Sequence, residues 1–252
     1  MSVKSAQRVL EIFELLIEYP GGLNVKEISE SLSFPQSSTF TLVKTLHEAG
    51  YVTQDMQKRY KLGPKLIHLG TSAMDSLDIH TEGLPHLQEL MRRGEETVFM
   101  AVLSVDELVY VAKIDNNRSI RTSAQPGYRK PLYCTGLGKA FLAFIPHEEQ
   151  VKLLEHIELL PITENTITDK TVLKKQLTEF RKQGYSIDDE ENEEGLYCLA
   201  APVYGPMGDV RAAISMAGPK NRMQHRKDKL AEDLLYTAEK ISESIGYFPK
   251  SR

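Results

Sequence analysis

The strongest constraint on the fold of this 252-residue chain is a change of hydrophobic period near residue 50. Before it, apolar residues recur every three or four positions, as on one face of a helix. The first such stripe, which ends at Pro20-Gly21-Gly22, consists of Val9, Ile12, Phe13, Leu16 and Ile17. After residue 50 the helical period is lost. The first 62 residues therefore predict three helices followed by two short strands.

The second and third helices are predicted from their start signals. Asn24 with Glu27 three residues later is typical of a capping box and predicts a helix along Val25, Ile28 and Leu32. Ser33 with Gln36 predicts a second capping box, before a third helix that Gly50 ends. The inward face of that third helix is expected to carry Thr39, Leu42, Val43 and Leu46.

Two short strands are predicted at 51–53 and 60–62, joined by the polar loop 54–59. Three helices and a β-hairpin form the pattern of a winged helix-turn-helix domain. A plain small α-helical domain is the alternative, but it gives no reason for a polar outer face on the third helix or for a basic loop tip.

The outer face of the third helix suits contact with DNA bases. Serine, threonine and glutamine reach base edges in the major groove, and Phe40 suits a thymine methyl group. Lys44, Lys58 and Arg59 are expected to contact phosphates. The predicted DNA-binding residues are Gln36, Ser37, Ser38, Phe40, Thr41, Lys44, Lys58 and Arg59.

The formal net charge of −4 hides an uneven distribution. Residues 1–70 contain eight basic and seven acidic side chains, whereas the remainder contains 23 and 28. Any DNA-binding face must therefore be local. No apolar run approaches the ~20 residues that span a bilayer. Cys134 and Cys198 are the only cysteines, which excludes a disulfide framework. A cytoplasmic protein without a membrane partner is expected.

The rest of the chain predicts an α+β domain. A connecting helix is expected over 64–77, then a helix ending near Gly94 and a buried hairpin of 97–103 and 108–114. Further helices are expected at 136–145, 147–156 and 169–183, with strands at 185–188, 196–204 and 209–217 and a long closing helix. An antiparallel sheet with helices around it fits this order. The predicted domains are 1–63, a linker over 64–79, and 80–252.

Two segments of the second domain attract attention. A glycine-containing turn, 135–138, starts a helix, and a helix N-terminus favours a carboxylate. It is not a phosphate-binding P-loop, because Tyr133 and Ala140 occupy positions that need Gly and Ser or Thr. The second is the acidic run 188–194, in which Glu190 to Glu194 are expected to form a solvated turn. Asp188 ends a strand and is expected to point into the fold.

An enzyme is the alternative class, in which the N-terminal helices would only mediate assembly around a small-molecule site. The sequence lacks the motifs that such chemistry needs. No Gly-x-Ser-x-Gly elbow surrounds Ser186, and His147-Glu148-Glu149 lacks the second histidine of a zinc protease. The two cysteines have no metal-ligand spacing. We therefore expect no catalytic residue, no metal and no cofactor.

The N-terminal part resembles the DNA-binding half of the IclR family of bacterial transcriptional regulators. The resemblance lies in residues 6–12, 26–29, 35–39 and 45–52, ending with 60–63. Two positions depart from the family pattern. Ser33 stands in place of the usual turn glycine, and Thr41 replaces a basic residue common on the recognition helix. The resemblance implies a sequence-specific regulator, expected to be a repressor, that binds an operator in double-stranded DNA.

The second domain resembles the GAF-like effector-binding domain of the same family. Relatives that bind small oxo-acids imply a pocket at Gly136, Leu137, Asp188, Cys198, Ser215 and Ala217, to which the turn itself adds Thr135. Leu137 and Ala217 replace a smaller residue and a serine, so a tighter or more apolar pocket is expected. The implied partners are a small anionic organic effector and further copies of the chain. A homodimer or a dimer of dimers is expected, with the helix from Pro64 to Leu77 as part of the contact.

Overall fold

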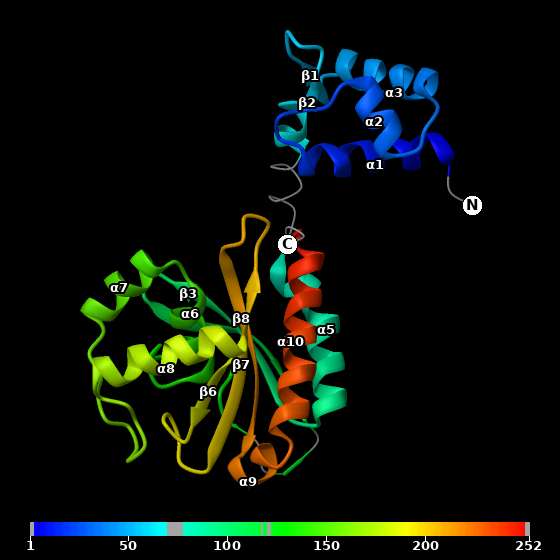
Figure 1. Cartoon of the computed structure of the whole chain (residues 1–252). Coiled ribbons are helices and arrows are strands. Elements are labelled where there is room, and N and C mark those ends of the chain that lie inside the picture. The colour runs from blue at the N-terminus through cyan, green and yellow to red at the C-terminus, as the bar shows by residue number, and fades with distance from the viewer. Residues whose placement is uncertain (1–2, 70–77, 117, 120–121, 250–252) are drawn as a thin grey trace. The chain divides into compact units, whose positions relative to one another are not determined.

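The computed structural model describes residues 3–69, 78–116, 118–119 and 122–249. The chain divides into two compact units, Met1–Leu77 and Asp78–Arg252. Figure 1 shows both units, which are described separately below.

The first unit is a helix-turn-helix with a β-hairpin. Helices α1 (Lys4–Glu18), α2 (Val25–Ser31) and α3 (Gln36–Glu48) precede strands β1 (Val52–Gln54) and β2 (Tyr60–Leu62). The two strands pair antiparallel. The buried core of the unit joins all five elements and consists of Ile12, Leu16, Leu23, Ile28, Val43, Leu46, Val52 and Tyr60.

The start of α2 confirms the predicted capping box, whereas the start of α3 does not. Asn24 Oδ1 accepts the Glu27 backbone N–H at 3.0 Å, and Glu27 accepts the Asn24 N–H at 2.8 Å. The N-cap of α3 is Pro35, without a side-chain hydrogen bond, so the expected Ser33–Gln36 box is wrong. Ser33 instead has a φ of 54°, a left-handed conformation that glycine adopts at lower cost.

The second unit contains a six-stranded antiparallel sheet in the order β5-β4-β3-β8-β7-β6. The strands are β3 (Thr97–Ser104), β4 (Glu107–Ile114), β5 (Arg129–Lys130), β6 (Ser186–Asp189), β7 (Leu196–Tyr204) and β8 (Val210–Pro219). Strands β3, β7 and β8 are buried along most of their length, because helices cover both faces of the sheet.

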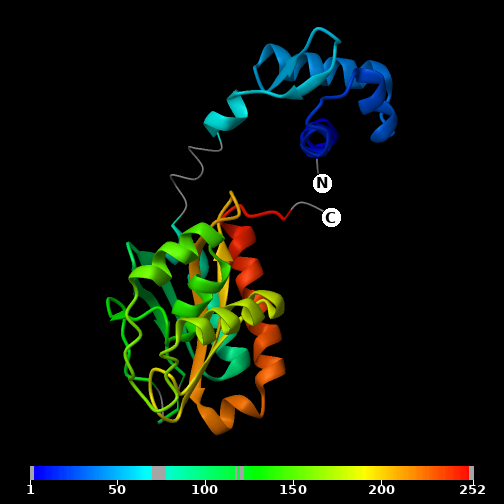
Figure 2. The ribbon, with the colours of Figure 1, turned by 60° about the vertical axis from the view of Figure 1, so that its left-hand side comes forward.

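Helices α5 (Ile79–Gly94) and α10 (Lys227–Ser244) lie on one face of this sheet, and α6 (Gly136–Phe144) and α8 (Lys170–Gln183) lie on the other. The two views in Figures 1 and 2 agree on this layering. Two hydrophobic cores follow from it. One is built around Leu87, Leu234 and Ile241, and the other around Phe141, Leu177 and Phe180. Helices α7 (His147–His156) and α9 (Lys220–Gln224) are peripheral.

The helix-turn-helix and the antiparallel α/β domain confirm the predicted fold class, but two short elements were not predicted. These are β5 and α9, whose lengths are too small for a hydrophobic period. Of the expected connecting helix, residues 65–69 are helical, and residues 70–77 lie outside the described residues. No helix in the described ranges has both the length and the apolar character needed to cross a bilayer.

Candidate DNA-binding face and effector pocket

The outer face of α3 is polar and solvent-exposed. Its predicted base-contacting residues Gln36, Ser37, Phe40 and Thr41 are all exposed. The Thr41 hydroxyl donates to the Ser37 carbonyl oxygen at 3.1 Å, which fixes its rotamer on the helix. Lys44 lies one turn further, 3.8 Å from the exposed Glu48 carboxylate. Such exposed pairs are weak, so Lys44 remains available to a phosphate.

Ser38 is tied to α1 rather than free. Its hydroxyl accepts a hydrogen bond from the Arg8 guanidinium at 3.2 Å, and this guanidinium also lies 5.0 Å from the centre of the Phe34 ring. Arg8 therefore connects the first helix to the turn before α3. Arg8 is not among the predicted DNA-binding residues, because its contact with Ser38 spans 30 positions of the sequence.

The two basic residues of the wing, Lys58 and Arg59, differ in their contacts. Lys58 is exposed at the tip, with a φ of 56°. The Arg59 guanidinium donates to the Gly22 carbonyl oxygen at 2.9 Å and pairs with Glu27 at 3.1 Å. These contacts join the hairpin to α2, and a phosphate contact of Arg59 stays a prediction. Met56, 94% exposed at the same tip, was not predicted.

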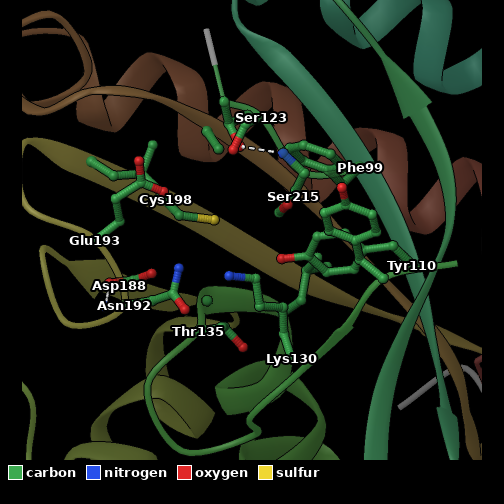
Figure 3. Close-up of a pocket in the computed structure, with 17 residues that line it drawn as sticks. Phe99, Tyr110, Ser123, Lys130, Thr135, Asp188, Asn192, Glu193, Cys198 and Ser215 are labelled. Carbon is green, nitrogen blue, oxygen red and sulfur yellow. Dashed lines mark hydrogen bonds between the residues drawn. The ribbon is translucent and has the colours of Figure 1, made fainter. Parts of the chain in front are cut away.

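A cavity of about 50 Å³ lies between the start of α6 and the sheet of the second unit. It admits only a few water-sized groups. All seven residues named from the sequence line it: Thr135, Gly136, Leu137, Asp188, Cys198, Ser215 and Ala217. Figure 3 shows the Cys198 thiol turned toward the space that Thr135, Asp188 and Asn192 border.

The floor of the cavity is a row of residues in register across neighbouring strands. Asp188 of β6 pairs with Cys198 of β7, and Cys198 pairs with Ala217 of β8. Two positions along β8, Ser215 pairs with Phe99 of β3. Because side chains alternate between the two faces of a strand, Ser215 and Ala217 point to the same side. Asp188 and Ala217, which are 29 positions apart in the sequence, thus belong to one surface.

The start of α6 is pressed against this floor. A Cβ atom on Gly136 would lie 2.7 Å from the Cys198 sulfur, so no other residue fits without displacement. A Cβ atom on Gly138 would lie even closer to its neighbour, 2.4 Å from the Leu132 backbone. The Thr135 hydroxyl caps the helix by accepting the Gly138 N–H at 3.1 Å. The N–H groups of Gly136 and Leu137 have no partner along the helix.

Asp188 is a buried acid at the edge of the cavity. Its side chain is 2% exposed, and one carboxylate oxygen accepts the Glu191 backbone N–H at 2.9 Å. Burial raises the pKa of Asp188 to about 7, against the opposing effect of the Lys139 ammonium group. Burial likewise raises the pKa of the Cys198 thiol to about 12, so the sulfur is a neutral thiol.

The acidic turn is not solvated throughout, which corrects the expectation for Glu190 to Glu194. Glu191 is 3% exposed and forms an ion pair with Lys139, which is completely buried in α6. Glu190 pairs with Lys220 of α9. Only Glu193 and Glu194 are exposed as predicted. A charged run in the sequence does not reveal which of its members has a buried partner far along the chain.

Seven polar residues that line the cavity were not predicted as part of it: Tyr110, Thr122, Ser123, Tyr128, Lys130, Asn192 and Glu193. Lys130 of β5 brings a positive charge to the lining, and Glu193 brings a negative one. Figure 3 shows the Lys130 ammonium group directed inward, and no ion-pair partner for it occurs in the described part of the chain. The Ser215 hydroxyl is completely buried, and the described structure offers it no partner stronger than the sulfur of Cys198, a weak acceptor. No cluster of metal-ligating side chains occurs in the described ranges.

Comparison with known proteins decides the family. A model of the IclR helix-turn-helix domain matches residues 5–56, and a model of the C-terminal part of the bacterial transcriptional regulator IclR matches residues 71–243. The chain belongs to the IclR family. It is 35% identical over 248 residues to the HTH-type transcriptional regulator KdgR of Escherichia coli K12, covering 98% of this chain and 94% of KdgR.

Two further members of the IclR family are similar over nearly the whole chain. The HTH-type transcriptional repressor AllR of Klebsiella pneumoniae is 35% identical over 250 residues, covering 98% of this chain and 92% of AllR. The crystal structure of the Thermotoga maritima IclR superposes with a TM-score of 0.66 at 33% identity, covering 97% of this chain and 99% of that one. This IclR-family protein is therefore a DNA-binding transcriptional regulator, and its relatives are regulators rather than enzymes.

Proposed function

We propose that this IclR-family protein is a repressor that binds its operator as a symmetric dimer or dimer of dimers. The direction of regulation follows the repressors among its relatives. The exposed polar face of α3 and the Lys58 wing tip supply one half-site contact each. One recognition helix covers few base pairs, so two-fold pairing with helices ~34 Å apart, or a multiple of that, supplies the specificity. Its site of action is the bacterial cytoplasm.

We also propose that a small, carboxylate-bearing effector binds in the cavity above β7 and β8. The observation that carries this proposal is the Ser215 hydroxyl, which is completely buried, faces the cavity and has no partner in the described structure stronger than the weakly accepting Cys198 sulfur. An unpartnered buried hydroxyl costs about 1–3 kcal/mol, and a ligand acceptor removes that cost.

Charge and shape define the effector further. The Leu137 N–H, the N-terminal dipole of α6 and the Lys130 ammonium group favour a carboxylate. Leu137 and Ala217 contact an apolar portion. Asp188 is neutral when protonated and then donates a hydrogen bond to a hydroxyl or keto oxygen. The cavity volume of about 50 Å³ excludes ligands larger than a few water-sized groups.

The coupling to DNA requires that the effector bind the DNA-competent and the DNA-incompetent states with different affinity, because equal affinity shifts no equilibrium. The test is a gel-shift assay on the upstream region of the protein's own gene, repeated with each member of a panel of small carboxylates. Thermal stabilisation is measured with the same panel. Specific binding that one carboxylate releases supports the proposal. Failure to prefer any genomic fragment over random DNA contradicts the operator part, and a panel without effect contradicts the effector part.

A further inference from the structure

The cavity of the second unit is too small to keep an effector carboxylate away from Asp188. A sphere with its volume of about 50 Å³ is only about 5 Å across. Asp188 lines this cavity and is 2% exposed. A carboxylate bound inside is therefore a near neighbour of the Asp188 carboxyl group. When two carboxylates share one site, the pKa of one of them is strongly raised, because both cannot stay ionised side by side.

One oxygen of Asp188 is held by the backbone, and the other is available to a proton. Oδ1 accepts the Glu191 N–H at 2.9 Å and the Asn192 N–H at 3.4 Å. Oδ2 has no hydrogen-bond partner among the residues that the structure describes. Figure 3 shows the carboxyl group beside the space that the Lys130 ammonium group also faces. A proton on Oδ2 turns that oxygen from an acceptor into a donor to the effector.

The charges around the cavity do not compensate two carboxylates. Lys130 is the one lysine, arginine or histidine among the described lining residues, and Glu193 opposes it with a negative charge. Lys139 of α6, which also acts on Asp188, is already paired with the buried Glu191. An effector carboxylate beside an ionised Asp188 therefore leaves two negative charges in one small cavity without a cation of their own. A proton on Asp188 removes one of these charges.

The other titratable groups near Asp188 are not poised to exchange this proton. Burial raises the pKa of the two nearby thiols to about 12 and also raises the pKa of the nearby tyrosine, so these three groups stay neutral. Helix α8 adds the uncharged Gln176, which donates to Glu191 at 3.5 Å. Burial raises the pKa of Asp188 itself to about 7. The charged and titratable neighbours from all packed elements are Tyr110 of β4, Lys130 of β5, Cys134, Lys139 of α6, Glu191, Glu193 and Cys198 of β7.

We propose that the effector binds together with one proton, which Asp188 takes up from the solvent as the carboxylate enters the cavity. This inference rests on the proposed effector site and adds a regulation of that site. The affinity for the effector is complete while Asp188 is already protonated in the free protein, and it falls as the pH rises and the free protein loses that proton. The regulator thus responds to an anion and to the pH at once.

Isothermal titration calorimetry of the full-length protein with sodium acetate and sodium glycolate tests the proton uptake. At each pH the titration is repeated in two buffers of different ionisation heat, and the difference between the measured heats gives the number of protons taken up. We expect about one proton per bound carboxylate at pH 8 and almost none at pH 6. The affinity should be about tenfold weaker at pH 8 than at pH 6, as for a single group that titrates near pH 7.

Asp188→Asn is the variant that assigns the proton to this residue. Its amide is neutral at every pH, accepts the Glu191 N–H and donates from the position of Oδ2, as the protonated acid does. The variant should bind both probes at pH 8 about tenfold more tightly than the parent and without proton uptake. A purely structural role of Asp188 gives no such gain. Glu193→Gln, at the exposed acid of the lining, is the matched control and should keep the pH dependence of the parent.

The outcomes separate this inference from the effector site on which it rests. Carboxylate binding by the parent without proton uptake at pH 8 overturns the inference and leaves the effector site in place. The same holds if Asp188→Asn binds no more tightly than the parent at pH 8, or if its affinity still depends on pH. If neither probe nor any other carboxylate of the panel binds between pH 6 and pH 8, the effector site and this inference fail together.

Discussion

Lys139 is completely buried in the first turn of α6 and forms an ion pair with Glu191, 52 residues later in the chain. Gln176 of α8 accepts a second hydrogen bond from the ammonium group at 3.1 Å, and the Phe180 ring lies 5.3 Å away. The pair joins α6, α8 and the acidic turn, three residues after Asp188 of the cavity lining. It thereby holds the start of α6 against β7.

Removing one member of this pair is expected to be costly. Lys139→Met leaves the Glu191 carboxylate buried without its cation, which destabilises a protein by about 3–5 kcal/mol. Adding Glu191→Gln to the same protein removes the uncompensated charge and is expected to recover most of that loss. Chemical denaturation of the parent, both single variants and the double variant measures the coupling. Additive losses in the double variant would contradict the ion pair.

Ser215→Ala is expected to raise the stability of the free protein while weakening effector binding. The hydroxyl has only the weakly accepting Cys198 sulfur beside it within the described structure, so its removal relieves a desolvation cost of about 1 kcal/mol. Ser186→Ala is the matched control, because the Ser186 hydroxyl donates to the Gly136 carbonyl oxygen at 2.7 Å and its loss should destabilise. Thermal unfolding with and without the effector measures both quantities. Equal destabilisation by the two variants would show that Ser215 is satisfied.

Gly136→Leu is expected to fill the cavity and abolish the response to the effector, while binding to the operator persists. The milder Gly136→Ala brings a methyl group against Cys198 and should cost about 1–3 kcal/mol, part of which Cys198→Ala restores. Gly138→Ala meets the Leu132 backbone, so no side-chain change relieves it. Gel shifts with and without the effector give the response, and denaturation gives the stability. A Gly136→Leu protein that responds like the parent places the effector elsewhere.

The stability of the second unit should fall as the pH rises toward 7, with Asp188 as one source. Its pKa is raised from 3.8 to about 7 by burial, so between about pH 4 and pH 7 the folded chain binds a proton that the unfolded chain has released. The free energy of unfolding then decreases with rising pH by up to about 1.4 kcal/mol per pH unit for one proton. Asp188→Asn should remove this contribution. Denaturation curves at several pH values compare the two proteins, and identical slopes would refute it.

Lys58 and Arg59 should behave differently in DNA binding although they are neighbours. Lys58→Ala is expected to reduce the salt dependence of operator affinity by about 0.9 for each phosphate that the side chain neutralises in the parent. Arg59→Ala should leave that slope nearly unchanged, because its guanidinium is held by Gly22 and Glu27. Fluorescence anisotropy over a range of salt concentrations gives the slopes. A reduction in slope by Arg59→Ala equal to that by Lys58→Ala would assign Arg59 to the phosphates.

The sequence predicted those features that repeat along the chain. Helical stripes and apolar strands revealed most elements of both units, since each depends on a local period. Lys139 and Lys130 could not be predicted, because nothing near them in sequence marks one as buried and the other as directed into a cavity. The same reason explains Arg59, whose partner Glu27 lies 32 positions away. Ser33 was expected to cap α3, and its left-handed backbone conformation, with a φ of 54°, was not predicted.

The row of pocket residues across β6, β7 and β8 has a consequence for how such a regulator acquires a new signal. Hydrogen bonds between strands join backbone atoms, so the sheet keeps its register when the side chains on the floor are exchanged. The side chains at positions 198, 215 and 217 can therefore be exchanged without a change of fold, and position 137 lies on α6, outside the sheet. The backbone that sets the fold is thus separate from the side chains that select the ligand. A few substitutions on the floor of the pocket are enough to change which effector the protein binds.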